Sequence, residues 1–267
     1  MKILKKINKL KGDAKLKFIE SNYDKIIKAK KEILKRNISL GFDLSLNIKD
    51  NVIYEKAKKS IDLNSINLKK DEILVFFIAN TYLWLDNHDD IHDLGVFKES
   101  LNNNFHQRDH EFKVGSRIGD VFKMIEVPVS WRDLGIDKEG ETEILIVVSV
   151  VKKDYNKVVF EDYMKMKANQ HSVGMWYEDI KLAVNNPLNE EMYSLWREYI
   201  NLIGNKEKAE EKGYFYVVKK GGLREVSYVL LGSNTLTPTI KVFTENNFNE
   251  NKEDNELQIY KQFLNIN

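Results

Sequence analysis

The apolar positions of the chain follow a helical pattern at its start. Up to Arg36, isoleucine and leucine recur at roughly helical spacing, and lysine and arginine greatly outnumber the acidic residues. This predicts one or two basic amphipathic helices. The most frequent role of such a charged surface is a solvated helix face, and the alternative is a docking or removable helix. A further helix is predicted over about 51–62, with Asp50 as its N-cap.

From about Asp71 the pattern changes to short apolar runs that are rich in β-branched and aromatic residues. These runs predict strands over 73–78, 118–129, 143–151 and 171–180. Ile144–Val151 is the most apolar run of the chain, so we expect it at the centre of a sheet. Segments 214–219 and 224–231 predict a hairpin that turns at Gly221 and Gly222.

Helices are predicted between these strands. They cover 93–104 with Asp93 as the cap, 158–169, and 189–203 with Gly204 as its end. The tail is acidic and rich in asparagine, and within it only 257–264 is expected to form a short helix. Short strands interrupted by helices favour an α+β sheet or barrel over a doubly wound fold. The chain therefore divides into a basic helical extension (1–70), a central domain (71–244) and an acidic, flexible tail (245–267).

The amino-acid composition excludes several classes of protein and of catalytic site. The 267 residues suffice for one domain with appendages and a sizeable core. The formal net charge of +1 gives no overall attraction to nucleic acid or membranes. No apolar run reaches the roughly 18 residues of a transmembrane helix. The chain has no cysteine, which excludes disulfides, thiolate zinc sites and a cysteine nucleophile.

The candidate chemistry centres on Ser172. A serine in a strand is most often structural, but a nearby glycine, Gly174, lets backbone approach a ligand closely. All five histidines lie between positions 88 and 171. This distribution suggests a serine nucleophile and a base that come from separate segments. His171 adjoins Ser172 but points to the opposite face of the strand, so it is a poor base for this serine.

His110 is the better candidate for the base, because a histidine at a loop-to-strand junction can reach across to a neighbouring strand. Its common alternative role is a surface histidine in a polar loop. Glu225 is an acid within an apolar strand, where it could orient the histidine. It could also be an exposed edge residue or a partner of Arg224. Asp109 and Asp120 remain alternatives for the acid.

A metal-dependent hydrolase is the enzymatic alternative. Two histidine pairs have the i, i+4 spacing of a zinc pair, and acids surround the first: His88 and His92, His106 and His110, with Asp86, Asp89, Asp90 and Asp93. The glutamate of the H-E-x-x-H motif is replaced by Gln107, and such pairs are common by chance. We therefore expect no metal and no cofactor.

Four segments in this order resemble the prohead maturation proteases of tailed phages, serine peptidases related to the herpesvirus assemblins. They are Asp86–Phe97 ahead of Lys98–Leu101, Arg108–His110 with Arg117–Val121, His171–Met175, and Leu223–Val229 with Gly232–Asn234 and Thr237–Pro238. The resemblance covers roughly 73–240. The first 70 residues exceed what the family core needs, and the predicted helix over 189–203 would be an insertion or a dimerisation element.

The resemblance implies an assemblin-like α+β fold, with a mainly antiparallel β-barrel or sheet surrounded by helices and 71–244 as the protease domain. Ser172 would be the nucleophile, His110 the general base and Glu225 the third member of the triad. The backbone N–H groups of Val173 and Gly174 would stabilise the oxyanion.

The resemblance also implies a biological setting. The substrates would be the phage scaffold protein and the major capsid protein, and also the protease itself, cut inside the assembling procapsid in the host cytoplasm. The related assemblins suggest a homodimer or higher oligomer, without nucleic acid or membrane partners. A non-catalytic capsid-assembly protein with the same fold is the third interpretation. The joint presence of Ser172, His110 and Glu225 argues against it.

Overall fold

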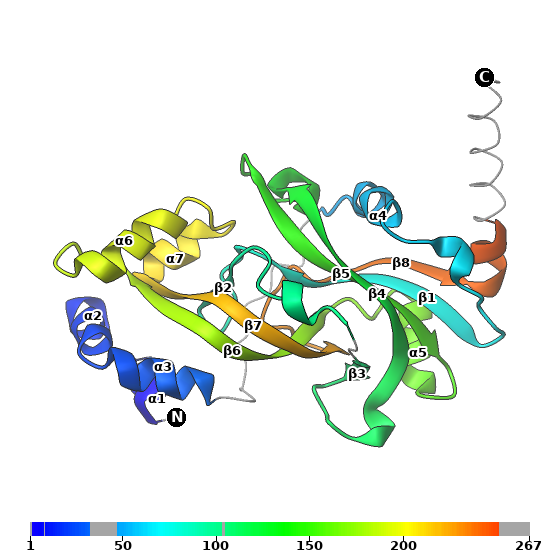
Figure 1. Cartoon of the computed structure of the whole chain (residues 1–267), viewed down its shortest axis with the longest axis horizontal. Coiled ribbons are helices and arrows are strands. Elements are labelled where there is room, and N and C mark those ends of the chain that lie inside the picture. Colours follow the sequence, from blue (N-terminus) through cyan, green and yellow to red (C-terminus); the bar gives the residue numbers. More distant parts are fainter. Residues whose placement is uncertain (1, 8, 33–46, 103–104, 251–267) are drawn as a thin grey trace.

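The computed structural model describes residues 2–7, 9–32, 47–102 and 105–250 (Figure 1). Its centre is a sheet of eight strands: β1 (Glu72–Thr81), β2 (Asp90–His92), β3 (Phe105–Arg108), β4 (Arg117–Ser130), β5 (Glu141–Lys152), β6 (His171–Val184), β7 (Tyr214–Tyr228) and β8 (Thr239–Thr244). The helices are α1 (Lys2–Ile7), α2 (Gly12–Glu20), α3 (Tyr23–Lys31), α4 (Asp50–Lys58), α5 (Lys157–Met164), α6 (Glu190–Tyr199) and α7 (Lys206–Lys212). None of the helices in this described part is long and apolar enough to span a membrane.

The strand order of the sheet is β2-β7-β3-β4-β5-β1-β8, and β6 pairs with β7. β5 lies between β4 and β1, which confirms the prediction that the most apolar run is central. The 15-residue strand β7 carries β6 along one edge, and β2 and β3 in succession along the other. Helices combined with a mainly antiparallel sheet agree with the predicted α+β class. Among the described strands the sheet is open and does not close into a barrel.

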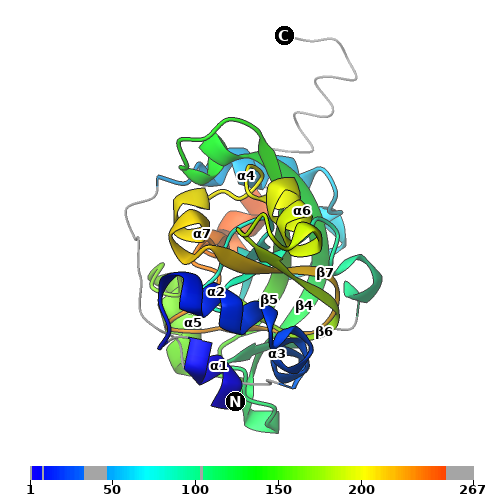
Figure 2. The same ribbon diagram turned by 90° about the vertical axis from the view of Figure 1, so that its left-hand side faces the viewer.

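Two hydrophobic cores cover the two faces of the sheet. In β1 the side chains alternate, so that Leu74 and Phe76 enter one core while Val75 and Phe77 enter the other. The first core is closed by α4, α6 and α7, and the second by α1–α3 and α5. Figure 2 shows α1–α3 and α6–α7 on opposite sides of the β6–β7 pair.

Two predicted elements are wrong. Within 93–102 the chain does not form the predicted α-helix: after β2 it turns at Gly95, whose φ of 68° is left-handed, and then forms a 3₁₀ turn over Lys98–Ser100. The glycines at 221 and 222 do not turn a hairpin but lie inside the continuous strand β7. They are needed there because a Cβ on Gly222 would collide with the indole of Trp176 on β6.

Smaller differences concern the ends of elements. Asp50 is the first residue of α4, and Lys49 occupies the cap position. α6 stops at Tyr199, ahead of the predicted end at Gly204. The start of the predicted flexible tail packs on the first core, because Phe248 is buried against Phe243. The predicted short helix over 257–264 lies outside the described residues.

Candidate active site

One pocket of about 690 Å³ opens beside the β6–β7 pair, and it brings the three predicted catalytic residues together. Ser172 comes from β6, Glu225 from β7, and His110 from the turn that follows β3. These segments are far apart in the sequence. They meet because β7 pairs with both β6 and β3.

The turn after β3 presents His110 in an uncommon backbone conformation. Asp109 and His110 have φ values of 56° and 53°, so two successive residues other than glycine are left-handed. The turn is fixed by two bonds to β7: Asp109 N–H donates to Tyr228 O at 3.0 Å, and His110 N–H donates to Ser227 Oγ at 3.1 Å. Such conformations persist only where the surroundings enforce them, and they cluster at functional sites.

Glu225 is a fully buried carboxylate with two hydrogen bonds. One oxygen lies 2.5 Å from His110 Nδ1, and the other accepts a hydrogen bond from Ser227 Oγ at 2.5 Å. Ser227 thus bridges the turn and the acid, since it also accepts the His110 N–H. Because Nδ1 faces the carboxylate, Nε2 is the ring nitrogen that remains for a substrate or a nucleophile. Of the candidate acids, the structure places Glu225, and neither Asp109 nor Asp120, against His110.

Ser172 lies on the same face of the sheet as Glu225. In the antiparallel pairing, Ser172 is opposite Ser227 and Gly174 is opposite Glu225, so these four side-chain positions share one face. The neighbouring positions Val173 and Val226 point to the second core instead. Within the described residues Ser172 Oγ has no hydrogen-bond partner, and neither has His110 Nε2. Bonds between a nucleophile and its base are often long without substrate.

Gly174 makes room for the buried acid. A Cβ at position 174 would collide with Oε1 of Glu225 and would lie 2.8 Å from its carboxyl carbon, a separation that real Cβ contacts essentially never show. The φ of Gly174 is not left-handed, so the glycine is required by space and not by backbone geometry. Gly174, two residues after Ser172, therefore leaves the space that the Glu225 carboxylate needs in order to bond to His110.

The hydrogen-bond pattern between β6 and β7 also shows that the backbone N–H groups of the two predicted oxyanion donors, Val173 and Gly174, point in opposite directions. Val229 N–H donates to Gln170 O at 3.0 Å, which makes 170 and 229 a hydrogen-bonded pair. Since such pairs alternate, the backbone of Gly174 faces β7 and the backbone of Val173 faces the opposite, free edge of β6. The N–H of Val173, next to the serine, is thus directed away from the ladder.

His171 and His106 belong to a buried network behind the pocket. The hydroxyl of Tyr163 lies 2.9 Å from His171 Nε2 and 3.2 Å from His106 Nε2. His171 Nδ1 faces the carbonyl of Thr237, so it carries the proton, and its Nε2 accepts from Tyr163. His106 Nδ1 lies 2.9 Å from Ser149 Oγ, so both ring nitrogens of His106 have partners in the core. Burial lowers the pKa of His171 to about 3 and that of His106 well below its ordinary value.

This network predicts acid-sensitive folding. In the unfolded chain both imidazoles take up protons near their ordinary pKa of about 6.5, whereas the folded protein keeps them neutral. We expect the free energy of unfolding to fall as the pH drops from about 6.5 toward 3, measured as urea midpoints at pH 7.5 and 5.5. In the folded protein, the NMR signals of His106 and His171 should not titrate above pH 5. A midpoint near 6.5 for either ring would contradict the assignment.

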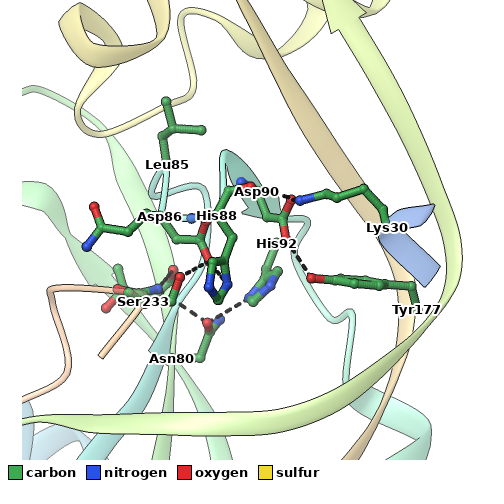
Figure 3. Close-up of polar contacts among 12 residues, drawn as sticks. Lys30, Asn80, Leu85, Asp86, His88, Asp90, His92, Tyr177 and Ser233 are labelled. Carbon is green, nitrogen blue, oxygen red and sulfur yellow. Dashed lines mark hydrogen bonds and ion pairs between the residues drawn. The ribbon is translucent and has the colours of Figure 1, made fainter. Parts of the chain in front are cut away.

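Asp86, His88 and His92, three residues of the metal alternative, line the same pocket, and Asp90 lies beside them (Figure 3). Asp86, His88 and Asp90 could together hold a cation, since one ligand atom from each lies within 4.8 Å of the others. A cation of the chain is already there. The buried ammonium of Lys30, from α3, pairs with Asp90 and donates to His88 O at 2.8 Å. Asp90 also accepts from Tyr177 at 2.6 Å.

Among the described residues, the four histidines of the metal hypothesis do not form one ligand set, although His88, His92 and His110 line the same pocket. His92 Nδ1 donates to the amide oxygen of Asn80 at 2.7 Å, and both ring nitrogens of His106 are engaged inside the core. Burial would raise the pKa of Asp86, but His88, His92, Lys30 and the bond from Ser233 outweigh it and lower that pKa. Burial lowers the pKa of His92. The carboxylates Asp86 and Asp90 therefore already have hydrogen-bond or ion-pair partners from the chain.

Comparison of the chain with protein-family models, with curated proteins and with solved structures gives no match. The function is therefore inferred from the residues and geometry of the site. Sequence patterns did not identify Ser227, the left-handed turn or Lys30, which support residues at the pocket through their bonds to Glu225, His110 and Asp90. The one available signal was the apolar context of Glu225, which is unusual for an acid unless it has buried partners.

Proposed function

We propose that the protein is a serine endopeptidase. The observation that carries this proposal is the buried Glu225, which holds one nitrogen of His110 in a pocket that Ser172 also lines. A buried acid, an imidazole oriented by it and a serine hydroxyl that lines the same pocket are the residue types that acyl transfer needs. Two left-handed residues that present the histidine add to this support.

The proposed reaction follows from the orientation of His110. Its Nε2 takes the proton of Ser172 while Oγ attacks a peptide carbonyl, and Glu225 stabilises the imidazolium. The imidazolium then gives the proton to the leaving amine, and water releases the acyl group by the reverse sequence. The oxyanion lies at the free edge of β6, where the N–H of Val173 is the available donor. Gly174, whose backbone faces β7, is the less suitable of the two predicted donors.

The biological setting is proposed from the resemblance to the tailed-phage prohead proteases and to their assemblin-like fold. The substrates are the phage scaffold and major capsid proteins, together with the protease itself. The place is the assembling procapsid in the host cytoplasm, with a homodimer or higher oligomer as the active form and no nucleic acid or membrane as partner. The order of the four resembling segments supports this setting, because three of them supply His110, Ser172 and Glu225.

The test is intact-mass analysis of the wild type beside Ser172→Ala, incubated alone and with the scaffold and capsid proteins of the same virus. We expect cleavage by the wild type, none by Ser172→Ala, and loss on the order of 10²-fold or more in Glu225→Gln. The fragment masses then give the cut sites. Equal cleavage by the wild type and Ser172→Ala would overturn the assignment of Ser172.

The metal-dependent alternative gives a different result in the same assay. The Lys30 ammonium already balances Asp90, so we expect chelator to leave cleavage unchanged. Loss of cleavage with EDTA, restored by a divalent metal, would favour the alternative. Absence of cleavage in every arm, with folding intact, would favour a non-catalytic assembly protein.

A further inference from the structure

Arg224 has been turned toward the pocket by an irregularity in β7. Gly174 pairs with Glu225, but the next residue, Met175, pairs with Leu223, so Arg224 is an extra residue in a β-bulge. A bulge breaks the alternation of side chains and often re-aims one beside an active site. Arg224 accordingly lines the same pocket as its neighbour Glu225, although it remains exposed.

The guanidinium of Arg224 is held in place by an aromatic platform. It lies 5.5 Å from the ring centroid of Trp176. The indole packs against Gly222, where an added Cβ would collide with the ring, and its Nε1–H donates to Glu178 at 3.0 Å. Glu178 in turn pairs with Lys220 at 3.4 Å. The indole thus orients the guanidinium of Arg224 without neutralising its charge, since the nearby Glu178 pairs with Trp176 and Lys220 instead.

The charges that line the pocket are unevenly balanced. Each of its carboxylates has a hydrogen-bond or close polar partner from the chain: Asp86 lies 3.8 Å from His88 and accepts from Ser233, Asp109 lies 3.7 Å from Arg108, and Glu225 lies 2.5 Å from His110. Arg224 has no carboxylate within 4.0 Å among the described residues. It is therefore a cation without an ion-pair partner in the described part of the chain, at a pocket whose carboxylates already have polar partners.

We propose that Arg224 is a specificity-determining residue that binds a carboxylate side chain of the substrate polypeptide near the scissile bond. This inference rests on the proposed function and adds a substrate preference to it. A planar guanidinium held on an aromatic face offers a fork of N–H donors that matches a carboxylate with two parallel bonds. Less conformational entropy is lost on binding, because the side chain is already oriented.

The first experiment measures binding, so that it does not depend on turnover. Labelled 12-residue peptides that overlap along the scaffold and capsid proteins are titrated onto Ser172→Ala, and binding is followed by fluorescence anisotropy. In each peptide that binds, every Glu is changed to Gln and every Asp to Asn, one at a time. We expect one such change to weaken binding at least about tenfold. The same change should have no effect on Ser172→Ala/Arg224→Ala.

The second experiment measures specificity in the active protein. We expect Arg224→Glu to cut the acidic sequence poorly and to prefer the counterpart with lysine at the sensitive position. Arg197→Ala is the matched control, because Arg197 also stacks on an aromatic ring, Tyr193, on the exposed surface of α6 outside the pocket. If Arg224→Ala keeps the preference for the carboxylate, or if no carboxylate matters, the inference fails. Cleavage that depends on Ser172 would in that case still support the protease.

Discussion

Alanine at position 174 is expected to reduce kcat/KM for peptide cleavage by on the order of 10²-fold or more. The added methyl group would lie within 3 Å of the Glu225 carboxyl carbon, so the carboxylate must move. Because Glu225 is buried and holds both His110 and Ser227 at 2.5 Å, any movement breaks the bond that orients the imidazole. The measurement is steady-state cleavage of a peptide that spans a mapped cut site.

Gly115→Ala is the matched control, since a Cβ there meets nothing within 4 Å and its φ is not left-handed. It should leave both cleavage and stability unchanged. In a Glu225→Ala background, Gly174→Ala should cost little more, because the two changes act through one carboxylate. Full additivity of the two losses would show that Gly174 acts by another route.

Replacing Lys30 with methionine is expected to destabilise the fold by about 3–5 kcal/mol. The methionine keeps most of the apolar stem but removes the ammonium, so Asp90 remains buried without its cation. The ring of Tyr216 lies 4.1 Å from the ammonium and loses that contact as well. Urea unfolding, followed by circular dichroism, gives the free energy.

Lys31→Met is the control for this change, because Lys31 is the exposed neighbour on the same helix. It should shift the free energy by no more than about 0.5 kcal/mol. The double variant Lys30→Met/Asp90→Asn should recover part of the loss, since it no longer buries a lone charge. A Lys30→Met protein as stable as the wild type would show that the ion pair contributes nothing to the fold.

Much of the fold is predictable because its strands are strongly apolar. A continuous apolar run such as Ile144–Val151 is stable only where both faces of the strand are buried, which is at the centre of a sheet, and the structure places it there. The failures occur where tertiary contacts override local signals. Gly221 and Gly222 have the composition of a turn, but they lie inside a strand because Trp176 occupies the space above them.

The candidate site is partly predictable for a related reason. Ser172, His110 and Glu225 are of residue types that suggest acyl transfer, and the structure brings them to one pocket. Their mutual placement depends on the pairing of β7 with both β6 and β3, which local patterns do not encode. The residues that support the site could not be predicted from the sequence either. Ser227 and Lys30 are common residue types in ordinary sequence surroundings, and only the folded structure brings them against Glu225 and Asp90.

Lys30 has a consequence for how the pocket depends on its surroundings. A cation that belongs to the chain needs no supply from solution, cannot be removed by a chelator and remains present at any dilution, as for any tethered ligand. Its occupancy depends instead on the integrity of the N-terminal segment that carries it. A shortened chain that lacks α3 would therefore expose Asp90 uncompensated at the wall of the pocket, and that wall would become sensitive to the salt and metal ions of the medium.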